Sequence, residues 1–308
     1  MRQPELLPKR PGRQGAHLDL DDPSTYEAVL KGIDTLCLIT PSDPHQVTRE
    51  IGLIEAAKKV GVQRVIKLSV TGADFVCPIS VFAQWHAEIE DALRVSGIAH
   101  VILRPNFFMQ NALLQKASIE AGLYSEPLAT ASISYVDIRD IGEVAVLAAG
   151  GRRDDEALTL TGPEAIDGEQ VCAFLSQATG KVVRFVSPDL TNFRATLAGG
   201  KFPYWHIDAL TDLYARVQTG RAQHTSAVTA DIESVTGKRP RSFREFADAA
   251  FRARRSHGRP VRNQVSARFW SHLLNEDLSP DRDWPIDSGF DGLSLKPKCR
   301  QASDFIGI

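Results

Sequence analysis

The chain has 308 residues, of which 43% are hydrophobic and 24% are charged, and its formal net charge is −2. This composition is typical of a soluble globular protein and excludes collagen-like, coiled-coil and disordered chains. The nearly neutral charge gives no reason to expect nucleic acid or a membrane as a partner. The four cysteines are widely separated, and no apolar run reaches the ~18 residues that cross a bilayer. We therefore expect a cytoplasmic protein.

Short apolar runs alternate with helical patterns between about residues 16 and 150, which predicts an α/β fold with a doubly wound parallel sheet. Each run is short and ends near a Pro or a Gly, as buried parallel strands do. The predicted strands cover residues 34–40, 64–69 and 100–103. The predicted helices cover residues 22–32, 47–60, 82–95 and 137–150.

The alternation loosens from about residue 157 onward, which predicts a smaller, mostly helical second lobe. Strands are expected at 157–161 and 182–186, with a helix at 167–179 between them. Ser242 and Glu245 have the spacing of a capping box, so a last helix is expected to begin there. The predicted parts are a Rossmann-like domain that is incomplete at its start (1–155), a smaller substrate-binding lobe (156–255) and an irregular or disordered tail (256–308).

A nucleotide-binding domain normally opens with a strand, a Gly-rich turn and a helix, and we find no such pattern near residue 1. Gly12 and Gly15 follow a Pro- and Arg-rich stretch that cannot be a central strand. We therefore expect both glycines in a loop that binds no phosphate.

Five later segments resemble, in order and spacing, sequence blocks of the NmrA-like branch of the atypical short-chain dehydrogenase/reductase superfamily. They are residues 16–26, 30–34, 61–69, 97–111 and 135–142. The resemblance extends over about residues 16 to 252. It implies a Rossmann-like domain that binds NAD or NADP, and a small-molecule substrate held between this domain and the second lobe.

By the same resemblance, residues 16–20 correspond to the family's third strand, and the first strand, Gly-rich turn, first helix and most of the second strand are missing. The pyrophosphate would then lose its main anchor, and the residues that choose between NAD and NADP would be absent. The sheet would also expose a strand edge, which favours pairing with another chain. A protein partner or a homo-oligomer is therefore a further expectation.

The resemblance also implies where proton transfer takes place. Short-chain dehydrogenases use a Tyr as proton donor and a Lys four residues later to lower its pKa, and the equivalent residues here are Phe82 and His86. Phe cannot donate a proton, but His86 could act as a general acid or as a donor to a substrate carbonyl. In the alternative interpretation, His86 lies on the inner face of its helix and packs beside Trp85. The sequence leaves both interpretations open.

Polar residues after the predicted strands are candidates for cofactor binding, because open α/β sheets bind ligands at the carboxyl ends of their strands. Each has a structural alternative, since hydroxyls cap turns and a proline ends a strand. The candidates are Thr40, Pro41, Lys67, Ser69, Thr71 and Asn106.

Aromatic residues are candidates for contact with a planar substrate such as a quinone. Tyr204 and Trp205 belong to the densest aromatic segment of the chain, residues 201–206. The resemblance adds Phe82 and Phe107 to these candidates. Packing in the core is the alternative for all four side chains.

The sequence leaves two functions open. The first is an NAD(P)-dependent oxidoreductase that transfers hydride to a planar carbonyl, imine or quinone, with His86 as proton donor and, by resemblance, a role in secondary metabolism. The second is a non-catalytic regulator that senses a dinucleotide or binds a protein, as the family's namesake does. No H-E-x-x-H or paired-Cys spacing is present, so no metal site is expected.

Overall fold

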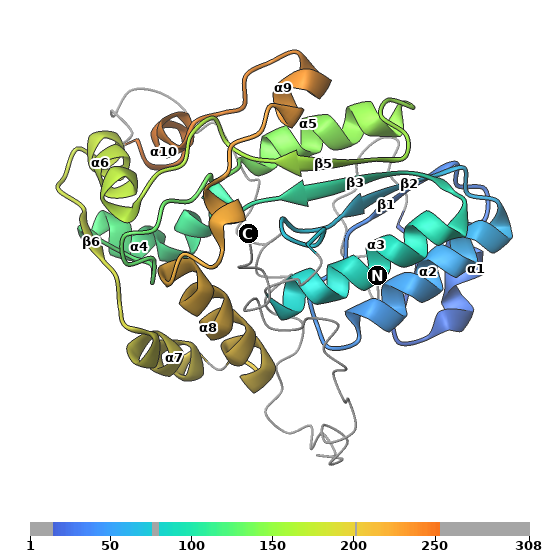
Figure 1. The fold of residues 1–308 in the computed structure, drawn as a ribbon, viewed down its shortest axis with the longest axis horizontal. Helices are drawn as coiled ribbons and strands as arrows, with labels where there is room; N and C mark the ends of the chain where they lie inside the picture. The colour runs from blue at the N-terminus through green and yellow to red at the C-terminus, as the bar shows by residue number, and fades with distance from the viewer. Residues whose placement is uncertain (1–14, 76–79, 201, 253–308) are drawn as a thin grey trace, which may run out of the picture. The chain divides into compact units, whose positions relative to one another are not determined.

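The computed structural model describes residues 15–75, 80–200 and 202–252, which are coloured in Figure 1. All of them except Phe75 belong to one compact unit. Gly12 and the predicted tail at 256–308 lie outside the described residues. No helix in the described ranges is both long and apolar enough to span a bilayer.

The centre of the unit is a parallel sheet, which confirms the predicted α/β class. Its register places Cys37 opposite Ile66, and Ile66 opposite Val101. The carboxyl ends of the strands therefore meet at one edge, where the candidate polar residues follow them. In spatial order the strands are β1 (Thr35–Leu38), β2 (Arg64–Leu68), β3 (Ala99–Pro105) and β5 (Glu156–Leu160).

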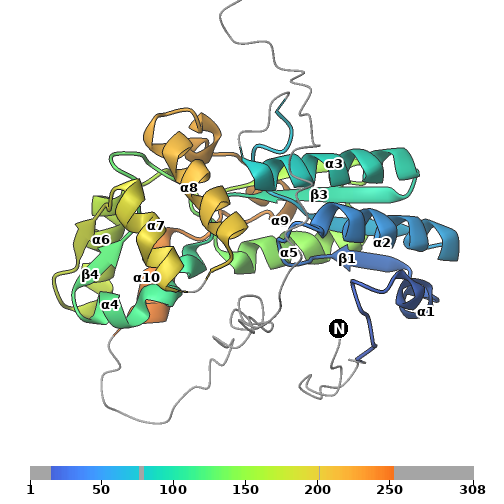
Figure 2. The same cartoon turned by 90° about the horizontal axis from the view of Figure 1, so that it is seen from below.

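Helices cover the two faces of the sheet, because successive strand side chains point to opposite sides. On one face, Val65 and Ile102 pack with α2 (Gln46–Val60) and α3 (Val81–Ser96). On the other face, Ile66 and Val101 pack with α5 (Ile138–Ala149). Figures 1 and 2 show α2 and α3 side by side, apart from α5. Each of these three helices begins and ends within one residue of its predicted bounds.

The expected strand at residues 16–20 is wrong: this segment has no regular secondary structure. A single strand is stable only when it pairs with another, and no strand among the described residues lies next to it or beyond the outer edge of β1. Leu18 and Leu20 instead pack against the hydrophobic core that contains Leu53 and Ile54 of α2. The helix expected after Asp22 is present as η2 (Pro23–Thr25) and α1 (Tyr26–Leu30).

A second hydrophobic core contains residues from before and after residue 155, where the boundary between the two parts was predicted. The boundary itself stays a prediction. β4 (Leu123–Ser125) pairs in parallel with β6 (Arg184–Val186), and Met109 and Tyr135 pack with Phe243 in one cluster. The remaining elements around this core and its connections are η3 (Met109–Gln115), α4 (Lys116–Glu120), α6 (Gly168–Thr179), α7 (Leu190–Gly199), α8 (Tyr204–Gln218), η4 (Gln223–Ser226), α9 (Asp231–Thr236) and α10 (Phe243–Phe251).

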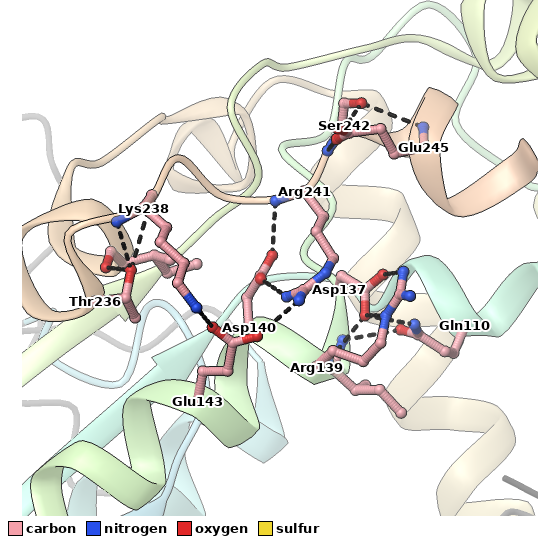
Figure 3. A network of polar contacts seen from close by, with 12 residues as sticks. Gln110, Asp137, Arg139, Asp140, Glu143, Thr236, Lys238, Arg241, Ser242 and Glu245 are labelled. Atoms are coloured by element: carbon pink, nitrogen blue, oxygen red, sulfur yellow. Dashed lines mark hydrogen bonds and ion pairs between the residues drawn. The ribbon is translucent and has the colours of Figure 1, made fainter. Parts of the chain in front are cut away.

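A polar network fixes the start of α5 to the segment between α9 and α10 (Figure 3). The Arg241 backbone N–H donates to Asp140 Oδ2 at 2.8 Å, and Arg241 Nη2 donates to Glu143 Oε1 at 2.7 Å. Asp137 caps α5 and accepts from Gln110 Nε2 at 3.0 Å. This network joins the sheet domain to the last helix, which begins at the predicted capping box of Ser242 and Glu245.

Candidate functional site

Lys67 is the most deeply buried charged candidate at the carboxyl edge of the sheet. Its side chain is 0% exposed and points from β2 toward α2 and α3. Its Nζ lies 3.0 Å from Glu50 Oε2 on α2 and 3.0 Å from His86 Nδ1 on α3, and it also donates to the Leu68 carbonyl. The ammonium group therefore has one buried ion-pair partner and two hydrogen-bond contacts within the protein.

His86 lies on the inner face of α3, one turn after Phe82, and is 5% exposed. Burial, and then the nearby charge of Lys67, lower its pKa well below the ordinary 6.5. The imidazole is therefore neutral, and its Nδ1 lies in hydrogen-bond contact with Lys67 Nζ. One nitrogen is thus satisfied, as the packing interpretation requires, while a role for Nε2 as donor stays a prediction.

Thr40 and Gln46 complete the buried group around Glu50. The Thr40 hydroxyl and Gln46 Nε2 both donate to Glu50 Oε1, the second at 2.9 Å. Gln46 Oε1 is buried and accepts no hydrogen bond in the described part of the chain. Pro41 follows Thr40 and is half-buried. An unpartnered buried acceptor beside β1 is a place where a donor from a ligand or a water would fit.

Ser69 belongs to a second polar group on the same face. Its hydroxyl donates to Glu90 Oε1 at 2.6 Å, and Arg104 from β3 binds both oxygens of Glu90. Burial alone would raise the pKa of Glu90, but the hydrogen bonds from Arg104 and Ser69 lower it below its ordinary value. Thr71 is half-buried, and its hydroxyl makes no hydrogen bond to another described residue.

Asn106 is buried and its polar atoms bind the protein itself. Nδ2 donates to Ser134 Oγ at 2.6 Å and to the Thr225 carbonyl at 2.7 Å, and Oδ1 accepts from the Phe107 backbone at 3.0 Å. These bonds join the end of β3 to η4. Asn106 therefore positions this turn, and its contact with a cofactor stays a prediction.

Aromatic rings join α3 to α8. Trp85 packs against Trp205 with ring centroids 5.7 Å apart, and Phe82 packs against His206 at 6.0 Å. Tyr204 is 80% exposed and takes no part in these ring contacts. The structure thus places Phe82 and Trp205 in one group of rings with Trp85 and His206, and leaves Tyr204 outside this group.

Phe107 contacts a polar cluster that no sequence pattern indicated. Its ring packs edge-on against Tyr135 and Tyr214. The hydroxyls of Tyr124, Tyr135 and Tyr214 all donate to the buried carboxylate of Glu126, at 2.5, 2.6 and 2.9 Å. No sequence signal could have found it, because the donors come from β4, a loop and α8.

Two surface hollows lie elsewhere. The first, of about 440 Å³, is lined by residues such as Gly97, His100 and Asp155 at the amino end of β3. The second, of about 190 Å³, is lined by residues such as Tyr26 and Arg49. Neither includes a predicted site residue. Groups of three or more side chains that could hold a metal ion are absent from the described ranges.

Comparison with known proteins identifies relatives over most of the chain. A model of the NmrA-like family matches residues 8–247. The chain is 35% identical over 240 residues to NAD(P)H azoreductase of Xenophilus azovorans, an alignment that covers 77% of the chain and 82% of the relative.

Solved structures share the fold at lower identity. The quinone oxidoreductase QOR2 of Escherichia coli, in complex with NADPH, superposes with a TM-score of 0.67 at 23% identity, covering 76% of this chain and 82% of that one. The negative transcriptional regulator Nmra superposes with a TM-score of 0.61 at 16% identity, covering 77% and 80%. The same fold is therefore found in a reductase and in a regulator.

Proposed function

Because the chain belongs to the NmrA-like family, we propose that it is an NAD(P)H-dependent oxidoreductase that reduces planar, electron-poor small molecules. The observation that carries this proposal is the 35% identity to an NAD(P)H azoreductase along 82% of that relative. Quinones, imines and azo compounds are the proposed substrate classes. The cytoplasmic location and the role in secondary metabolism stay predictions.

The described residues fit a nicotinamide cofactor in part. The unpartnered Gln46 Oε1 and the Thr71 hydroxyl lie after β1 and β2, where an open α/β sheet binds its ligand. A Gly-rich turn for the diphosphate does not follow any strand in residues 15–75. Thr40, Ser69 and Asn106 already bind partners in the protein, so their role would be to shape the site. The bound cofactor would supply the hydride.

His86 is the proposed hydrogen-bond donor to the substrate. As a neutral imidazole with Nδ1 occupied by Lys67, it presents an Nε2–H group. Such a donor stabilises the negative charge that develops on an oxygen or nitrogen when hydride arrives at its neighbour. Trp85, the residue before His86, packs against Trp205, and these two rings would contact a planar substrate.

The test is acceptor-dependent oxidation of NADPH and NADH by the purified chain under anaerobic conditions. A panel with one quinone, one azo dye and one iminium compound separates the substrate classes. We expect turnover with at least one acceptor and none without an acceptor. No turnover with any acceptor, together with no cofactor binding in calorimetry, would reject the reductase and favour the regulator that the fold also supports.

A further inference from the structure

Lys67 is a lysine with no exposed surface in a central strand, which is costly for a fold. Moving an ammonium group out of water costs several kcal/mol even after the protein relaxes, so buried lysines are rare unless they are fully paired. Here Nζ of Lys67 contacts Glu50 Oε2, the Leu68 carbonyl and His86 Nδ1. Two of these three partners are themselves titratable side chains on α2 and α3.

The direction of the hydrogen bond between Lys67 and His86 follows from the inventory of donors. An ammonium group has three donors and no acceptor, so in this 3.0 Å contact Lys67 donates and His86 Nδ1 accepts. Nδ1 therefore carries no proton, and the neutral ring holds its proton on Nε2. With Lys67 in its ammonium form, this contact thus selects one of the two tautomers of His86.

Glu50 favours the charged form of Lys67. Its carboxylate is 0% exposed, lies 3.0 Å from Nζ and is held in place by Thr40 and Gln46. Burial lowers the pKa of Lys67, while Glu50 and the more distant Glu90 act in the opposite direction. The net effect is a lowered pKa, so the Lys67 ammonium gives up a proton more readily than an exposed lysine does.

We propose that Lys67 holds His86 as the Nε2–H tautomer and supplies the proton that replaces the one His86 gives to the substrate. This rests on the proposed function. When hydride has reached the substrate, the anionic oxygen or nitrogen takes the Nε2 proton, and the Nε2–H bond breaks. One Nζ–H bond of Lys67 breaks as its proton moves to Nδ1. The imidazole stays neutral throughout, and Lys67 becomes a neutral amine.

Water restores the starting state after the product leaves. A proton from water binds Nε2, and the Nδ1 proton returns to Lys67, which becomes an ammonium again beside Glu50. The sequence of steps consumes one proton from solvent for each hydride transferred. Without Lys67, loss of the Nε2 proton would leave an imidazolate, which is so basic that the neutral ring would be a much weaker proton donor.

The first test measures the tautomer and needs neither cofactor nor turnover. We would record ¹⁵N spectra of histidine-labelled full chain and assign His86 by its loss in His86→Gln. The double variant Lys67→Met/Glu50→Gln removes both buried charges together, so neither is left unpaired. The matched control is Lys59→Met/Glu27→Gln, which removes an exposed ion pair on neighbouring helices.

The expected result is an Nε2–H tautomer in the wild type and in the control, and a mixture of tautomers in the Lys67→Met/Glu50→Gln variant. An unchanged Nε2–H signal in that variant would overturn the proposed role of Lys67. A wild-type chain with the expected tautomer but no turnover would contradict the proposed function and leave the Lys67–His86 bond established.

The second test separates proton supply from positioning. In Lys67→Arg, the guanidinium can donate to Nδ1 and pair with Glu50, but it does not release its proton. If its spectrum retains Nε2–H, we expect kcat to fall by about 10²- to 10⁴-fold, the usual effect of losing a general acid. A kcat equal to that of the wild type would overturn the proton supply.

The wild type gives an independent measure through its rates in mixtures of H₂O and D₂O. If two protons move in the rate-limiting step, kcat depends on the fraction of D₂O along a curve, and this result supports the proposal. A linear dependence of kcat on the fraction of D₂O, which indicates a single moving proton, contradicts it.

Discussion

Arg104 on β3 and Glu90 on α3 form a buried two-point ion pair. Arg104 Nε donates to Oε1 at 3.0 Å and Nη2 donates to Oε2 at 2.6 Å, and the two side chains are 7% and 1% exposed. Ser69 donates to the same carboxylate at 2.6 Å. Ser69 and this ion pair together therefore connect the end of β2 to β3 and α3.

Glu90→Gln should destabilise the fold by about 3–5 kcal/mol, because it removes the buried counter-charge of Arg104 and leaves only the exposed Asp74 carboxylate to pair with its guanidinium. Urea unfolding followed by circular dichroism measures this change. Asp91→Asn, which breaks the exposed pair with Arg94 on the same helix, is the control and should cost less than about 1 kcal/mol. Equal effects of the two variants would mean that the buried pair contributes no more than the exposed one.

The same pair predicts how stability depends on pH. Glu90 has a pKa below its ordinary 4.5 in the folded protein, so the folded state binds its proton less readily than the unfolded state does. Its contribution is fully present above pH 4.5 and is lost as the pH falls through the lower folded-state pKa. The difference in unfolding free energy between wild type and Glu90→Gln should therefore shrink below pH 4.5. A difference that stays constant down to acid pH would contradict this assignment.

His86→Gln should lower kcat for the reduction by about 10²- to 10⁴-fold, the range expected when a proton donor is removed. The affinity for NADPH should change little, since the hydrogen bond of His86 goes to Lys67, whereas Thr40 and Gln46 bind Glu50. Steady-state kinetics and a fluorescence titration with NADPH measure the two effects separately. His17→Gln, at an exposed position, is the control. Unchanged kcat in His86→Gln would favour the packing interpretation.

Tyr214→Phe should destabilise the second core by about 1.5–3 kcal/mol, because the buried Glu126 carboxylate loses one of its three hydroxyl donors. Tyr204→Phe is a matched control on the same helix, where the side chain is 80% exposed, and it should have no measurable effect. Thermal unfolding of the two variants makes the comparison. A Tyr214→Phe protein as stable as the control would show that two donors are enough for Glu126.

Gly162→Ala should destabilise the protein by about 1–3 kcal/mol or more, because a Cβ there would lie 2.1 Å from the Tyr135 carbonyl oxygen. Gly142→Ala is the opposite case, since this glycine lies in α5 with no atom within 4 Å of the added Cβ. It should stabilise the protein by about 0.5–1 kcal/mol. Denaturant titrations measure both changes, and reversed signs would show that the packing around these two glycines differs from that described.

Local patterns were enough to predict the elements that carry their own signals. The helix from Gln46 to Val60 has an apolar repeat, and the helix after Ser242 has a capping box. β4 was missed because it has three residues and pairs with β6 about 60 residues later. The expected strand at 16–20 failed because its pattern cannot show whether a partner strand is present.

The candidate site divides in the same way. The carboxyl strand ends were predictable from the fold class, and Lys67, Ser69 and Asn106 do lie there. The partners of Lys67 and Ser69 were not predictable, because Glu50 and Glu90 reach them from neighbouring helices. The apolar repeat of a helix does not define its rotation about its own axis accurately enough to predict such a contact. The bond between Lys67 and His86 therefore required the three-dimensional structure.

A single-turnover experiment with NADPH deuterated at the transferred position would show directly whether this protein transfers hydride. The chain is mixed anaerobically with an imine, a quinone or an azo dye, and the deuterium content of the product is measured by mass spectrometry. With an imine, the deuterium is retained on carbon, which makes it the decisive acceptor. We predict deuterium in the reduced imine, formed more slowly by His86→Gln. A reduced imine without deuterium, or no product with any of the three acceptors, would contradict the assignment of this protein as an NAD(P)H-dependent reductase.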